Sequence, residues 1–121
     1  MITIGQTIYS LLTGSTAVTG YTGNNIYPLI IPENTPLPCI VYERRSNNDY
    51  SKDGLSLFDI TVDLMVISED YIQSIDVSNT VNSVLNGYKN SNIRGIKFVG
   101  IDELYSDGVF IQKLTYNIKS V

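Results

Sequence analysis

Two aspartates, Asp59 and Asp63, come closest to the spacing of a catalytic carboxylate pair. Paired carboxylates can exchange a proton in acid–base chemistry or hold Mg²⁺. Both lie in a segment whose apolar and polar residues alternate, so they point to one face of a strand. Four residues of extended chain separate them by roughly 13 Å, which is too far to share one proton or one ion. We therefore interpret both as solvated charges on the outer face of a sheet.

The other residue types exclude the common nucleophilic and metal sites. The chain has no histidine and one cysteine, so it cannot build a Ser–His or Cys–His pair, an internal disulfide or the usual zinc sites. Cys39 stands beside apolar residues and is interpreted as a small buried side chain. Asp49, Asp53 and Gly54 lack the twelve-residue calcium-loop pattern. We predict that the protein is not an enzyme and uses no cofactor or metal.

The composition indicates one folded domain over residues 1–121. A hydrophobic content of 43% and a charged content of 17% are typical of a folded protein. Nine tyrosines suit subunit boundaries, and equally the edge of a core. The net charge of −4 argues against a strong sequence-independent grip on nucleic acid, which requires a basic patch. We expect no leader, no membrane segment and folding in a reducing cytoplasm.

The sequence of the first third of the chain predicts one helix and a stiff, proline-rich segment that leads into a strand. A helix over residues 3–13 is indicated, with Thr3 able to cap it and Gly14 able to end it. Residues 15–25 are rich in Gly, Thr and Ser and predict a loop, with at most a short turn. Ile26 and Tyr27 are predicted to have an extended backbone up to Pro28. Further prolines stiffen the chain before a predicted strand over residues 39–45. The apolar stripe of the helix consists of Ile4, Ile8, Leu11 and Leu12.

The rest of the chain predicts three strands and a long helix. Residues 58–67 alternate cleanly between apolar and polar, and residues 46–54 predict an exposed connection into that strand. Ser68 can start a helix that Gly87 ends. Residues 96–105 and 109–118 form a hairpin around Asp107–Gly108, in which Gln112 marks an edge or a bulge. The order α-β-β-α-β-β predicts an α+β fold: an antiparallel-rich β-sheet of about four main strands, packed by an N-terminal helix and one long central helix.

Two isoleucines depart from the amphipathic pattern of the long helix. Ile72 and Ile75 lie roughly 120–180° around the helix from the valines at 77 and 81 that should face the sheet. The first helix or the proline-rich loop can cover them within one copy. Alternatively, another copy of the chain covers them, and both possibilities remain open.

The chain resembles the tail-completion (tail-terminator) proteins of long-tailed bacteriophages and prophages. The resemblance is carried by Ile26-Tyr27-Pro28, by Leu37-Pro38-Cys39-Ile40-Val41-Tyr42, by the strand ending at Val66-Ile67-Ser68 and by the helix closing at Leu85-Asn86-Gly87-Tyr88. The resemblance covers nearly the whole chain.

The resemblance implies a structural virion protein, located in the tail and assembled in the host bacterial cytoplasm. Such proteins form rings, typically hexamers, that cap the head-proximal end of the tail tube and join it to the head connector. The implied partners are other copies, the major tail tube protein and the connector, while DNA passes through the lumen without specific binding. A head-closure or adaptor protein of the virion neck, and a small ligand-binding or regulatory domain, remain alternatives. Candidate subunit contacts are Ile72, Ile75 and a polar hairpin that includes Arg44, Arg45, Tyr50 and Lys52.

Overall fold

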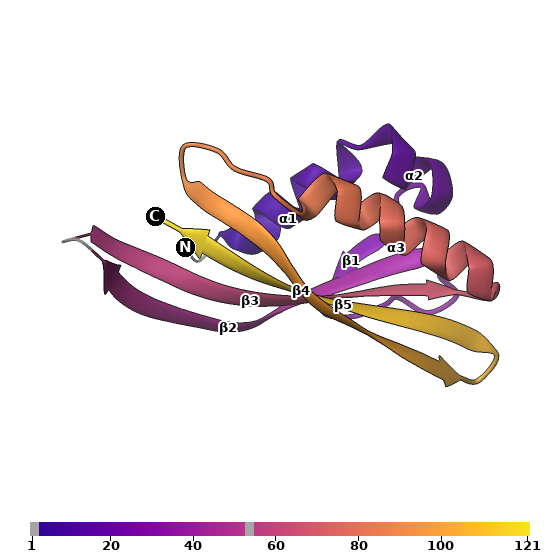
Figure 1. The fold of residues 1–121 in the computed structure, drawn as a ribbon. Helices are drawn as coiled ribbons and strands as arrows, with labels where there is room; N and C mark the ends of the chain where they lie inside the picture. Colours follow the sequence, from indigo (N-terminus) through magenta and orange to yellow (C-terminus); the bar gives the residue numbers. More distant parts are fainter. Residues whose placement is uncertain (1–2, 53–54) are drawn as a thin grey trace.

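A five-stranded sheet carries three helices on one face in the part of the chain that the structure, a computed structural model, describes (Figure 1). This part comprises residues 3–52 and 55–121, and for residues 46–52 and 55–57 it gives the backbone alone. The α+β class is confirmed. The elements in chain order are α1 (Ile4–Thr13), α2 (Thr16–Thr22), β1 (Ile26–Pro28), β2 (Cys39–Lys52), β3 (Leu55–Ser68), α3 (Tyr71–Leu85), β4 (Ile93–Ser106) and β5 (Val109–Ser120).

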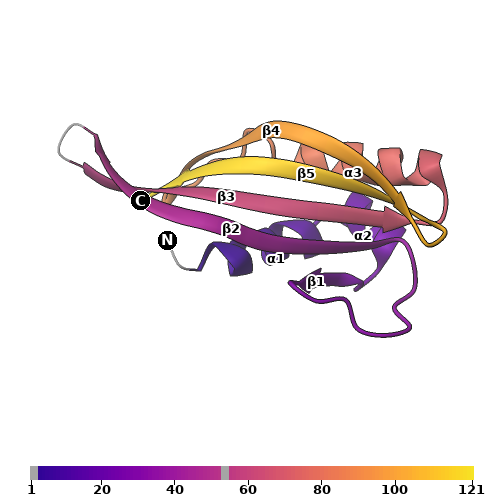
Figure 2. The same cartoon turned by 90° about the horizontal axis from the view of Figure 1, so that it is seen from below.

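The strands follow the order β1-β2-β3-β5-β4, so β1 and β4 form the two edges. Only β1 pairs in parallel, with β2, and the other neighbours are antiparallel. Seen from below, the strands lie in front and the helices behind them (Figure 2). The register places Phe110, at the start of β5, opposite Ser68, at the end of β3. The turn between β4 and β5 therefore lies beside the start of α3.

The main core lies between the helices and the sheet, where the alternation of β3 and the stripe of α1 predicted it. Helix α3 lies along the sheet and covers β3 and β5. The face of the sheet that bears the helices is apolar because every second residue of β3 and β5 points to it. The fully buried side chains of this core include Ile4, Ile8, Leu12, Ile60, Leu64, Val77, Val81, Leu85, Leu114, Tyr116 and Ile118.

The segment predicted as a loop at residues 15–25 contains the short helix α2, so that prediction is wrong. The Ser15 side chain accepts a hydrogen bond from the backbone N–H of Val18 at 3.3 Å, and Val18 is fully buried. A serine cap and one apolar anchor hold seven residues in a helix that is too short to show a hydrophobic period. Thr3 makes no side-chain cap at α1, whereas Gly14 does stand at its C-terminal end.

The strands are longer and more numerous than predicted. Ile26–Pro28 forms the edge strand β1 beside Ile40–Tyr42. Residues 46–52, predicted as an exposed connection, continue β2 because their backbone pairs with β3 as far as Leu55. Ladder hydrogen bonds thus hold a polar stretch that has no hydrophobic alternation. Asp53 and Gly54 lie outside the described residues.

Two polar residues near α3 also differ from their predicted roles. Asp70 rather than Ser68 caps the helix, because the Asp70 carboxylate accepts the N–H of Ile72 at 3.1 Å. Gln112 marks no edge, since β5 lies between β3 and β4. Its buried amide donates a hydrogen bond to the Ser74 hydroxyl at 3.2 Å, so a polar pair replaces an apolar contact between sheet and helix. The Asp107–Gly108 turn forms as predicted, with φ of 50° and 84°.

Candidate interaction surface at the start of the long helix

A group of large apolar side chains is exposed where the β4–β5 turn meets the start of α3. The Tyr71 ring lies 5.5 Å from that of Phe110, which lies 4.9 Å from that of Tyr105. Tyr105 and Ile72 are 65% and 62% exposed. We call Tyr71, Ile72, Tyr105 and Phe110 the tip patch. Rigid aromatic side chains that are exposed in one copy are typical of protein–protein contacts.

The tip patch forms from three elements because of the strand register. The turn at Asp107–Gly108 brings Tyr105 opposite Phe110 across the β4–β5 ladder. The pairing of β5 with β3 then places Phe110 opposite Ser68, shortly before α3 begins at Tyr71. The ring of Phe110 thus contacts those of Tyr105 and Tyr71, although Tyr71 is far from both in the sequence.

Carboxylates surround this apolar centre. The Tyr71 hydroxyl donates a hydrogen bond to the Glu103 carboxylate at 3.1 Å, and that bond raises the pKa of Tyr71. The bond also restrains the ring of Tyr71 against the hairpin. Other carboxylates occur just before α3, at Glu69 and Asp70, and in the turn between β4 and β5, at Asp107. An apolar centre with a charged rim is the usual composition of a protein interface.

The structure separates the residues predicted as subunit contacts. Ile72 is exposed as expected, whereas Ile75 is half-buried. Arg44 is exposed but pairs with Val62, midway along β3, and so lies well away from the start of α3. Arg45 reaches the opposite face of the sheet. The side chains of Tyr50 and Lys52 lie outside the described residues.

Sequence reasoning missed Tyr71, Tyr105 and Phe110 as candidate contacts. Tyr105 and Phe110 flank the Ser106–Gly108 turn, and aromatic residues on both sides of a tight hairpin are a local signal that could have identified them. Nothing local links them to Tyr71, because that contact depends on β5 pairing with β3 rather than with β2.

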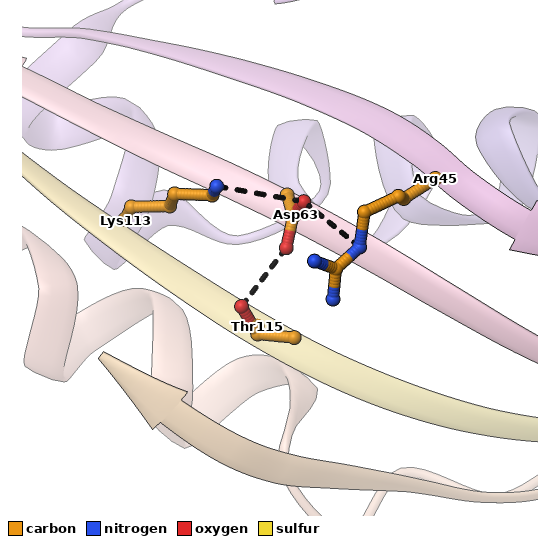
Figure 3. Close-up of polar contacts among 4 residues, drawn as sticks. All are labelled: Arg45, Asp63, Lys113 and Thr115. Atoms are coloured by element: carbon orange, nitrogen blue, oxygen red, sulfur yellow. Dashed lines mark hydrogen bonds and ion pairs between the residues drawn. The ribbon is translucent and has the colours of Figure 1, made fainter. Parts of the chain in front are cut away.

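The face of the sheet without helices carries a buried carboxylate, Asp63, in contrast to the solvated charge predicted there. Asp63 is 2% exposed. The Arg45 Nε and Lys113 Nζ atoms lie 3.4 Å and 3.9 Å from its Oδ2, and the Thr115 hydroxyl donates to its Oδ1 at 2.9 Å (Figure 3). The long side chains of neighbouring strands reach over the aspartate and exclude water, an effect that strand alternation alone does not reveal.

Asp59 lies on the same face and is more exposed to solvent than Asp63. Its side chain is 36% exposed and pairs with Lys119 at 2.9 Å. Hydrogen bonds from Lys119 and Asn117 hold the pKa of Asp59 below its usual value. Asp59 and Asp63 therefore have separate partners and do not act as a pair. Among the described residues, no group of three or more acidic, cysteine or histidine side chains is arranged to hold a metal ion.

Replacing Asp63 by asparagine is expected to lower the free energy of unfolding by about 1–3 kcal/mol, because a buried charged acceptor between two cations is lost. Urea denaturation followed by circular dichroism measures this change. Asp59→Asn is the matched control, since it removes an ion pair on the same strand that is open to water, and it should cost less than about 1 kcal/mol. Equal losses in the two variants would contradict a special role for the buried carboxylate.

Comparison with protein families decides where this chain belongs. Residues 6–110 match the model of the family described as tail completion protein gp17. The chain belongs to this family. Of solved structures, a chain from the "Virion of native gene transfer agent (GTA) particle" is similar over 93% of this chain and 90% of that chain, with a TM-score of 0.73 and 14% sequence identity. This likeness shows a shared fold, and the search of curated proteins gives no match.

Membership of the tail completion family confirms the resemblance seen in the sequence. Two of the stretches that carried it form adjoining parts of the structure: residues 26–28 are strand β1, and residues 39–42 are the start of its partner β2. The proline-rich segment between them thus connects two paired strands at one edge of the sheet. None of the helices that the structure describes is long and apolar enough to cross a membrane.

Proposed function

We propose that this protein is a structural component of a phage-type virion, forming a ring that caps the head-proximal end of the tail tube and joins it to the head connector. The observation that carries the proposal is the family match across residues 6–110, since it spans helices, sheet and tip patch alike. The fold shared with a chain of a gene transfer agent particle supports a place in a virion.

In this proposal the protein acts by shape and contact, without catalysing a reaction. The subunits assemble in the host bacterial cytoplasm and become part of the tail. DNA passes through the lumen without being held, in agreement with a net charge of −4 on each chain. The partners are further copies of the chain, together with the major tail tube protein and the head connector.

A ring requires heterologous contacts, in which one surface of a copy meets a different surface of its neighbour. The tip patch is the proposed first surface, because it exposes Ile72 and Tyr105 beside rings that already pack on one another. Ile75, half-buried one turn further along α3, extends this surface.

Light scattering coupled to size-exclusion chromatography tests ring formation. The expected species has the mass of about six copies of the 13.4 kDa chain. Adding the ring to purified tail tubes should place a cap on one tube end, visible by electron microscopy. A monomer at every concentration, with tube ends left bare, would contradict the proposal. A ring that binds the connector but leaves tube ends bare would instead identify a neck adaptor.

A further inference from the structure

Strand β4 presents an open backbone edge along its second half. It is the outermost strand on its side of the sheet (Figure 2), and a register shift between Phe98 and Gly100 divides it in two. Ile93 and Ile96, before this shift, are buried, whereas every residue from 101 to 106 is exposed. Residues 101–106 contain no proline and no further register shift, two of the devices that commonly block an edge strand. We call residues 101–106 the β4 edge.

The turn that follows β4 determines which backbone groups face outward. Ser106 and Val109 flank the two-residue turn and lie opposite each other, and in a hairpin of this kind these two residues form a hydrogen-bonded pair. Hydrogen-bonded and non-hydrogen-bonded pairs alternate from there, which turns the N–H and C=O groups of Ile101, Glu103 and Tyr105 away from β5. No backbone group in the part of the chain that the structure describes bonds to them. These three residues thus present a row of donors and acceptors that fits the edge of another strand.

The side chains of the β4 edge and its turn carry negative charge. Residues 100–107 include Asp102, Glu103 and Asp107 and no lysine or arginine. None of these three carboxylates forms an ion pair with another described residue. Lys113, the residue opposite Asp102, lies beside the buried carboxylate of the helix-free face instead. The β4 edge therefore has carboxylates to offer to the cations of another strand.

We infer that the β4 edge receives an extended, basic segment of a different protein, which pairs with it as an additional strand. The outward backbone groups supply the hydrogen bonds of such a β-augmentation. The carboxylates favour a basic segment, since opposite charges on neighbouring strands stabilise a sheet and like charges destabilise it. Ile101 and Leu104 are 48% and 54% exposed and point to opposite faces of the sheet, so an added strand covers apolar surface on both faces. The inference goes beyond the proposed ring and does not require it.

A different protein fits this edge better than a second copy, because no described strand of the chain is open, regular and basic at once. The first half of β4 carries Arg94 and Lys97, but register shifts interrupt it, and such shifts twist an edge away from a partner. The part of β2 beyond β1 also contains a register shift, and its Arg45 pairs with the buried Asp63. Strand β1 is short and uncharged, and β3 and β5 lie inside the sheet. Pairing one β4 edge with another would bring the carboxylates of both copies together.

Hydrogen exchange resolved residue by residue tests this pairing in the full-length protein. The probe is the peptide Thr-Val-Val-Lys-Lys-Val-Thr. In antiparallel pairing its lysines lie opposite Asp102 and Glu103, and its valines lie opposite Ile101, Leu104 and Tyr105. An excess of this peptide is expected to slow exchange at the outward amides of Glu103 and Tyr105 by roughly tenfold, about the effect of one net hydrogen bond. The amides of Asp102 and Leu104 face β5 and should change less. The same peptide with glutamates in place of its lysines is the control and should give no protection.

Two substitutions at Ile101 separate strand pairing from a contact made by side chains alone. Ile101→Pro removes an outward N–H that β5 does not use, so the chain should keep its fold while Glu103 and Tyr105 lose their protection. Ile101→Ala is the matched control, because it removes the same side chain, keeps the N–H and should retain most of the protection. The charge-reversed variant Asp102→Lys, Glu103→Lys is expected to exchange the preference, so that the glutamate peptide protects and the lysine peptide does not.

Each result bears on the strand pairing separately from the proposed ring. An absence of protection by the lysine peptide, or equal protection by both peptides, overturns the inference, and so does protection that survives Ile101→Pro. If that variant unfolds at a lower temperature, the charge-reversed variant decides the outcome. Outward amides that are protected in the chain alone, and become exposed on dilution, would show that a second copy occupies the edge. A chain that stays monomeric and is protected by the lysine peptide contradicts the ring and supports this inference.

Discussion

Ile72→Asp is expected to convert the proposed ring into monomers that keep the native fold. Ile72 is 62% exposed in one copy and makes no contribution to the core, so its loss should leave the monomer stable. Burying an isoleucine in a contact contributes roughly 1.5–3 kcal/mol, which corresponds to a roughly 10- to 150-fold change in affinity at each contact. Light scattering measures the mass, and circular dichroism measures the fold.

Val121→Asp is the matched control for this variant. Val121 is an exposed aliphatic residue that lies outside the tip patch, so the same change of charge there should leave the ring mass unchanged. Ile75 is the poorer site for the test, because it is half-buried and its replacement by aspartate acts on the fold as well. An Ile72→Asp variant that still forms a ring of wild-type mass would contradict the assignment of Ile72 to the interface. A variant that fails to fold would contradict it as well.

The features that sequence predicted well are those set by local chemistry. Strand β3 is predicted from the two-residue period of its side chains, and helix α1 is predicted from one apolar stripe. The Asp107–Gly108 turn depends on two residues that accept positive φ. In each case the signal lies within the residues that form the element, so no knowledge of the sheet order is required.

The features that sequence missed depend on partners far along the chain. The polar half of β2 is a strand because β3 lies beside it, and Asp63 is buried because Arg45 and Lys113 reach it from the strands on either side. The tip patch requires β5 to lie next to β3. Ile72 was singled out as a candidate contact because it lies off the apolar face of a helix, which is a local pattern. Tyr105 was missed because it breaks no local pattern of the sequence.

Tyr116→Ala is expected to have the largest effect on stability of the variants considered, lowering the free energy of unfolding by about 3–5 kcal/mol. Tyr116 is fully buried in β5 beneath α3, and burial raises its pKa. Its ring packs edge-on against Phe98 at 5.7 Å, and its hydroxyl donates to the Asn82 side chain in α3 at 2.9 Å. Since a domain of this size has about 5–15 kcal/mol of stability, the loss is a large share of the total.

Tyr116→Phe separates the two contributions of this side chain. It keeps the ring in the core and removes only the hydrogen bond to Asn82, so a loss of about 1 kcal/mol is expected. Urea denaturation of both variants gives the comparison. A phenylalanine variant as unstable as the alanine variant would mean that the hydrogen bond to α3, rather than the packed ring, holds the helix to the sheet. A small loss in both would mean that neighbouring side chains close the cavity left by the ring.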